Sequence, residues 1–334
     1  MFRVNMGVRD GEKILVVTDM PNSLEWREKS SLELNEILRR CLLAKKVGEI
    51  ASQNFPACKS RFHVYISTGR SGVEPSLDVG EEMRNADVVV AMSTHSLSHT
   101  KAREEACKAG ARVASMPGFL PEMLYAGGPM VVDHCRIVRE SEKLAGLLTN
   151  SVKAEVSSRY GTEISFSLEG RRGLSDTGLL VQRGSWGNLP SGEAFIAPVE
   201  GTTNGRVVVK RGWHPDLGED MILIFKDGNL SEVVGGGKVG RKLQDLMGFN
   251  TNAEPYLSRR NLAELGVGTN PNARRRNNIL EAEKIRGTVH IAVGGNSHMG
   301  GLVEADLHID FVLPKATLLL DDETIMKNGR LKFR

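Results

Sequence analysis

Ala86-Asp87-Val88-Val89-Val90-Ala91 contains an apolar run of the kind found in strands that are buried on both faces of a parallel sheet. A helix is expected to follow from about Thr100, a suitable N-cap residue, with Glu104 near the positive end of the helix dipole. Gly110 would end this helix, and residues 112–116 have the pattern of another short strand. Strand, helix and strand in this order predict a parallel α/β arrangement.

The same alternation extends over the first part of the chain. Residues 13–18 and 62–66 are further strand candidates, and residues 31–51 have a long helical pattern. We therefore predict an amino-terminal doubly wound α/β domain over residues 1–150.

The pattern changes in the second part of the chain. Strand candidates there lie close together, with turn sequences such as Asn204-Gly205 and Asp227-Gly228 between them. We predict a mixed, strand-rich α+β domain over residues 151–334, and this domain contains every candidate metal ligand.

The composition excludes several classes of protein. With 40% hydrophobic and 25% charged residues the 334-residue chain is an ordinary globular one, and a net charge of +3 does not predict a nucleic-acid or membrane partner. No apolar run approaches the roughly 20 residues needed to cross a bilayer. The cysteines show no CxxC spacing, which indicates reduced thiols in a cytoplasmic protein; they are Cys41, Cys58, Cys107 and Cys135.

Residues 306–311 suggest a metal site. His308 and Asp310 are two positions apart on a predicted strand, so they share one face, while Leu307, Ile309 and Phe311 share the other. Imidazole and carboxylate ligands together suit zinc, cobalt, manganese or iron. The candidate set exceeds the needs of one tetrahedral ion and favours two ions that share a carboxylate; it comprises Glu193, Glu264, Glu283, His290, His308 and Asp310.

Four segments of the second domain resemble motifs of the metalloaminopeptidases that include aminopeptidase T. In chain order they are residues 189–198 (LPSGEAFIAP), 263–270 (AELGVGTN), 288–294 (TVHIAVG) and 308–310 (HID).

The resemblance implies a homodimer that removes amino-terminal residues from short peptides at a site with two divalent ions, zinc, cobalt or manganese. All six candidate ligands would bind these ions. Glu264 would bridge them, and Glu283 would act as a ligand or as a proton shuttle.

One loop departs from that family. Its aminopeptidases have a catalytic tyrosine shortly after the strand of His290, whereas residues 294–301 here read GGNSHMGG. His298 can replace the tyrosine as a polarising donor, or it is only a loop histidine.

The resemblance also extends to ring-cleaving dioxygenases that act on dihydroxypyridines with a single iron(II). His290, His308 and Asp310 would then supply the two histidines and one carboxylate of a non-haem iron site. A metalloaminopeptidase is the first prediction from the sequence, and a ring-cleaving dioxygenase is the alternative.

Overall fold

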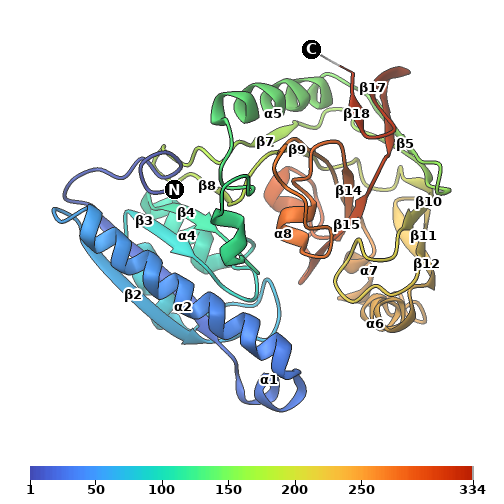
Figure 1. Cartoon of the computed structure of the whole chain (residues 1–334). Helices are drawn as coiled ribbons and strands as arrows, with labels where there is room; N and C mark the ends of the chain where they lie inside the picture. The colour runs from blue at the N-terminus through green and yellow to red at the C-terminus, as the bar shows by residue number, and fades with distance from the viewer. Residues whose placement is uncertain (333–334) are drawn as a thin grey trace. The chain divides into compact units, whose positions relative to one another are not determined.

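The computed structural model describes residues 1–332, in which the chain divides into two compact units (Figure 1). Unit 1 comprises Met1–Val131 and Gly178–Ser191, and unit 2 comprises Val132–Thr177 and the chain from Gly192 onward. Unit 1 contains a parallel sheet and unit 2 contains antiparallel sheets. The predicted fold class, an α/β domain followed by a strand-rich domain, is confirmed.

The sheet of unit 1 has the strand order β2-β1-β3-β4-β8, and every neighbouring pair is parallel. Helices α3 and α4 share an apolar core with β1, β3 and β4. Helix α2 packs against β1 and β2, on the opposite face as right-handed crossovers require (Figure 1). The strands are β1 (Lys13–Met20), β2 (Lys59–Ile66), β3 (Val88–Ala91), β4 (Arg112–Ser115) and β8 (Trp186–Asn188). The helices are α1 (Ser23–Glu28), α2 (Ser31–Asn54), α3 (Leu77–Arg84), α4 (Lys101–Ala109) and the 3-10 helix η1 (Pro121–Leu124).

Helix α4 forms where the sequence predicts it. The Thr100 side chain accepts a hydrogen bond from the backbone N–H of Arg103, and Gly110 ends the helix at a φ of 104°. Both ends of the helix are therefore set by local residues.

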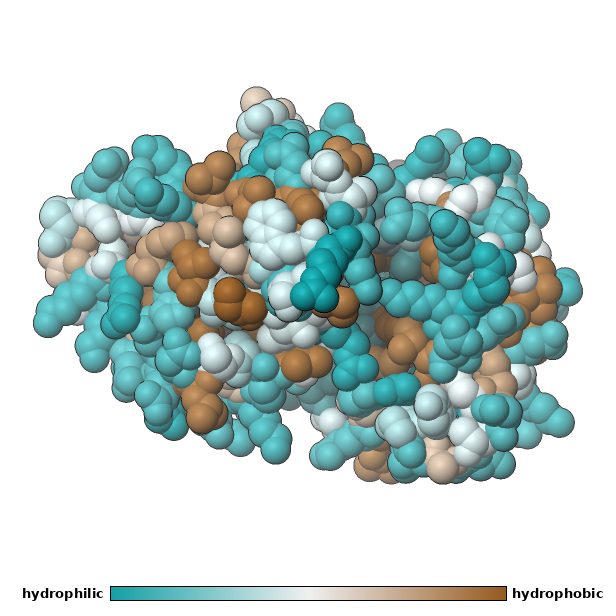
Figure 2. Space-filling model, turned by 90° about the horizontal axis from the view of Figure 1, so that it is seen from below, coloured by the Kyte–Doolittle hydropathy of each residue, from teal (hydrophilic) through white to brown (hydrophobic). Residues whose placement is uncertain are grey.

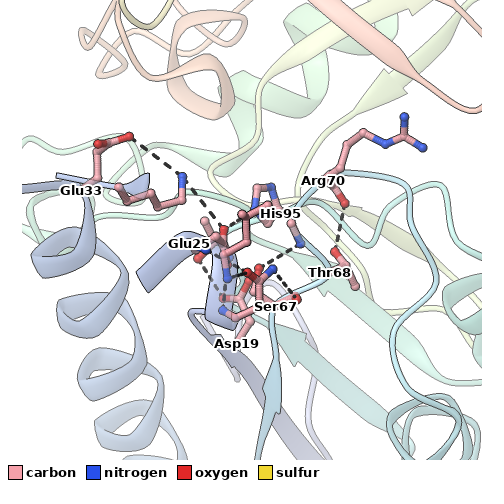
Figure 3. A network of polar contacts seen from close by, with 12 residues as sticks. Asp19, Glu25, Glu33, Ser67, Thr68, Arg70 and His95 are labelled. Atoms are coloured by element: carbon pink, nitrogen blue, oxygen red, sulfur yellow. Dashed lines mark hydrogen bonds and ion pairs between the residues drawn. The ribbon is translucent and has the colours of Figure 1, made fainter. Parts of the chain in front are cut away.

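Polar side chains form a network just beyond the carboxyl ends of β1 and β3 (Figure 3). The ring nitrogen Nε2 of His95 lies 2.9 Å from Oε1 of Glu25. Asp19 Oδ1 accepts a hydrogen bond of 2.7 Å from the backbone N–H of Thr94. The network ties the loop after β3 to the end of β1 and to α1.

The units differ from the predicted boundary at residue 150 in two ways. Helix α5 (His134–Thr149) belongs to unit 2, where it packs against β7 (Leu174–Asp176) and β9 (Glu193–Ile196). Residues 178–191 return to unit 1 and add β8 beside β4. A boundary placed where the pattern of predicted strands and helices changes cannot show that a later segment returns to unit 1, because this segment forms a strand of only three residues.

Unit 2 contains two antiparallel sheets. The larger has the order β12-β11-β10-β6-β5-β16-β17-β18, and the smaller has the order β15-β14-β13-β9-β7. The larger sheet comprises β5 (Lys153–Ser157), β6 (Glu163–Ser167), β10 (Asn204–Val209), β11 (Met221–Lys226), β12 (Asn229–Gly235), β16 (Thr317–Leu320), β17 (Glu323–Lys327) and β18 (Arg330–Leu331). The smaller sheet comprises β7 (Leu174–Asp176), β9 (Glu193–Ile196), β13 (Leu262–Gly268), β14 (Val289–Gly294) and β15 (His308–Leu313). The remaining helices are α6 (Gly237–Met247), α7 (Tyr256–Arg259), α8 (Ile279–Ala282) and the 3-10 helix η2 (Ser297–Met299).

The apolar core of unit 2 lies between these sheets. Leu265, Ile291 and Phe311 of the smaller sheet belong to one buried cluster with residues of the larger sheet such as Phe166 and Leu223. Successive side chains of a strand point to opposite faces of the sheet, so the residues between these apolar positions lie on the face of the smaller sheet that points away from the core.

The surface is that of an ordinary globular chain. Hydrophilic residues predominate on the face seen in Figure 2, and apolar residues are interspersed among them. All of the cysteines are free thiols. Within residues 1–332, no helix combines the length and the apolar character that spanning a membrane would require.

Candidate metal centre

The predicted ligands gather on one face of the smaller sheet of unit 2. Glu264 of β13 pairs with Ala292 of β14, which in turn pairs with Asp310 of β15. One step along the strands, Gly266 pairs with His290. Because side chains alternate along each strand, these positions face the same side, away from the apolar core.

Glycines on this face leave room for the site. A Cβ at Gly266 would lie 1.9 Å from Nε2 of His290, so the imidazole ring fits only over a glycine. A Cβ at Gly268 would lie 2.2 Å from the backbone oxygen of Ile285. The segment that follows α8, including Glu283, can therefore approach the sheet closely.

Five of the six predicted ligands form a continuous row of contacts. His290 Nε2 lies 3.4 Å from Glu193 Oε2 and 3.2 Å from Glu264 Oε1. His308 Nε2 lies 3.1 Å from Glu264 Oε2 and 3.6 Å from Asp310 Oδ1. The structure thus brings together residues that are far apart in the sequence.

The spacing of three of these residues fits one metal ion. Among the residues that the structure describes, Glu264, His308 and Asp310 are the group that places one ligand atom from each residue within 4.8 Å of the others. His308 Nδ1 lies 2.8 Å from the backbone oxygen of Gly295. A proton on Nδ1 can be donated to that oxygen, which leaves Nε2 available as a ligand.

Burial and neighbouring charges shift the pKa values at the centre. Burial alone would lower the pKa of His290, but its hydrogen bond with Glu264 and the nearby carboxylates raise it to about 9. Burial would likewise lower the pKa of His308, yet Asp310 and Glu264 raise it well above its usual value. Burial favours the neutral form of Glu264, but its hydrogen bonds with both histidines hold its pKa well below the usual range. The carboxylates of this centre thus stabilise positively charged groups beside them.

One buried oxygen also fits a cation at this place. Glu193 Oε2 accepts no hydrogen bond among the described residues, and it lies 3.4 Å from Nε2 of His290. A buried carboxylate oxygen without a hydrogen bond is costly, and a bound ion is one way to compensate it. The residues present therefore fit a metal ion, which would take the place of the protons between carboxylates and imidazoles.

The other two predicted residues lie beside this group. The ring of His298 packs edge-on against that of His308, with the ring centres 5.5 Å apart. Glu283 contacts the ammonium group of Lys284, whose Nζ lies 2.9 Å from Glu283 Oε1. Burial raises the pKa of Glu283 to about 8, although the charge of Lys284 opposes the shift.

Sequence reasoning missed Lys284, which is fully buried. Its ammonium group also contacts Oε1 of Glu193 and lies 3.9 Å from Oδ2 of Asp176. The available signal was its position directly after Glu283, a predicted ligand. Its contact with Glu193 depends on packing between residues 91 positions apart, which no local pattern shows.

Comparisons with known proteins point to one family. Residues 5–333 match the family model described as NicX, 2,5-dihydroxypyridine 5,6-dioxygenase. The 2,5-dihydroxypyridine 5,6-dioxygenase of Pseudomonas putida is 25% identical over 283 residues, which are 78% of this chain and 75% of that protein.

Two solved structures share the fold. That of 2,5-dihydroxypyridine dioxygenase from Pseudomonas putida has a TM-score of 0.71 at 18% identity, covering 97% of this chain and 92% of the other. Wild-type AmpT from Thermus thermophilus has a TM-score of 0.62 at 16% identity, covering 99% of this chain and 96% of the other. The resemblance to aminopeptidase T is thus supported at the level of the fold, whereas the family match names a dioxygenase. This chain belongs to the 2,5-dihydroxypyridine 5,6-dioxygenase family.

Proposed function

We propose that this protein is a dioxygenase that uses one iron(II) ion to open the ring of a dihydroxypyridine. The observation behind the proposal is the group of Glu264, from β13, with His308 and Asp310, from β15, whose ligand atoms lie within 4.8 Å of one another. Three protein ligands on one ion leave further positions open, as in the non-haem iron(II) oxygenases, although those sites have two histidines and one carboxylate and this group has one histidine and two carboxylates. Membership of the family supports the same reaction class.

The proposed ligand set differs from the triad of His290, His308 and Asp310 suggested by the sequence. Glu264 takes the place of His290, because its carboxylate lies with the other two ligands. His290 instead contacts Glu264 Oε1 at 3.2 Å, where it orients the carboxylate.

Each residue has a distinct part in this scheme. Iron(II) would supply the redox chemistry that ring cleavage by dioxygen requires. The backbone oxygen of Gly295 fixes the His308 ring through Nδ1, so that Nε2 faces the carboxylates. His298 packs against His308, where its ring can hold a proton released by a substrate hydroxyl group.

A metalloaminopeptidase is the second candidate. Glu193 contacts His290, and Glu283 contacts Lys284, which also contacts Glu193; additional carboxylates of this kind are what a site for two zinc, cobalt or manganese ions needs. Against it, the loop of residues 294–301 contains no tyrosine. The fold shared with AmpT does not distinguish the two reactions.

Parallel assays test the proposal. Protein that has been loaded with iron(II) under anaerobic conditions and then moved to aerated buffer should consume oxygen when 2,5-dihydroxypyridine or an isomer is added. The zinc, cobalt and manganese forms of the protein should not hydrolyse short peptides. Glu264→Gln should lower iron affinity and oxygen uptake by about 100-fold or more, because it removes a ligand charge. Glu163→Gln, at an exposed position of β6, is the matched control. Peptide hydrolysis by a two-ion form, without oxygen uptake by the iron form, would sink the proposal.

A further inference from the structure

Lys284 lies at the meeting point of three carboxylates from separate parts of unit 2. Asp176 comes from β7, Glu193 from β9, and Glu283 from the end of α8. The ammonium nitrogen lies 2.9 Å from Glu283 Oε1 and 3.9 Å from Asp176 Oδ2, and it also contacts Glu193 Oε1. The lysine side chain is only 1% exposed, so bulk solvent screens these charges little.

The surroundings of this ammonium group resemble those of a metal ion. Carboxylate oxygens from two strands and from the end of a helix converge on one point, as such oxygens do around a divalent cation. The point is also next to the metal centre, because Glu193 contacts Lys284 through Oε1 and lies 3.4 Å from His290 through Oε2. An ion bound between these carboxylates would therefore lie close to an ion held by Glu264.

We propose that Lys284 is an internal cation that occupies the place of a second metal ion and so limits the centre to one ion. The inference deepens the proposed single-iron function and rests on it. An ammonium group neutralises part of the charge of the three carboxylates and repels a dication at short range. Lys284 would thus decide which reaction class this fold can support.

Removal of the ammonium group should create a second site. Lys284→Met keeps a similar length without the charge and leaves Asp176, Glu193 and Glu283 available to a divalent ion. Manganese alone is the probe. We expect one ion per chain in the wild type and two in Lys284→Met, counted by equilibrium dialysis and elemental analysis. The paramagnetic resonance spectrum of the variant should show coupling between the two ions.

Two controls separate this site from adventitious binding. Lys153→Met removes an exposed lysine that pairs with Glu155, and it should leave the count at one. Lys284→Met combined with Glu193→Gln removes a ligand of the new site, and its count should return to one. The metal-free Lys284→Met variant should melt at a lower temperature than the wild type, and manganese should restore it.

A folded Lys284→Met variant that still holds one ion would overturn the inference, as would a wild type that holds two. If Lys284→Met does not fold, the double variant Lys284→Met with Asp176→Asn replaces it, because this variant has one fewer buried negative charge without a partner. It too should bind two manganese ions per chain. The proposed function fails independently. One ion in the wild type and two in the variant, without oxygen uptake, would contradict the dioxygenase and leave the role of Lys284 intact.

Discussion

Gly266 shows how far a single side chain can affect the metal centre. A Cβ at this position would lie 1.9 Å from Nε2 of His290, whose ring is 1% exposed and has little room to move. Gly266→Ala should therefore displace the ring from Glu264 and weaken metal binding by roughly 10- to 100-fold, as loss of an orienting partner does. Metal titration followed by calorimetry measures the effect. Gly146→Ala in α5, where no atom lies within 4 Å of the added Cβ, should bind metal as the wild type does.

The histidines of the centre give a second prediction at this scale, for the metal-free protein. The pKa of His290 is raised to about 9 in the folded chain, from 6.5. The folded state therefore binds this proton more tightly than the unfolded state, so its contribution to stability is complete below pH 6.5 and is lost as the pH rises to about 9. The melting temperature with a chelator present should fall over this range.

Metal should reverse that dependence. An ion bound to Glu264 competes with protonated His290 for this carboxylate, so metal affinity should rise with pH over the same range, and binding should release protons. His290→Gln should flatten the decline of the melting temperature in the metal-free protein. A decline that is equally steep in His290→Gln would show that other groups cause it.

At the scale of elements, regular patterns were predictable and contacts between distant segments were not. The alternation in β15 placed His308 and Asp310 on one face because a strand has a period of two residues. The cap and the terminal glycine of α4 were equally local signals. Strand β8 has only three residues, too few for a period, and its partner β4 lies more than 70 residues earlier in the chain. The contact of Lys284 with Glu193 could not be predicted from the sequence either, because the two residues are 91 positions apart.

The whole molecule divides into two units, and the proposed ligands come from unit 2 alone. Metal should therefore slow hydrogen exchange in β13, β14 and β15, because a ligand that binds only the folded state stabilises the structure that contains its site. Exchange in β1 and β3 of unit 1 should change much less. Hydrogen exchange measured by mass spectrometry with and without manganese checks this, and equal protection of both units would contradict it.

Strand β8 has a consequence for the synthesis of this protein. The ribosome releases the chain from its amino terminus, so Met1–Val131 emerges before the segment that completes its sheet. Helix α5 and strands β5, β6 and β7 must leave the exit tunnel before Trp186–Asn188 can pair with β4. During that interval the nascent chain presents an open strand edge, a template on which another chain can pair. The time spent translating about 50 residues, a few seconds at ordinary rates, is when a chaperone would protect it most.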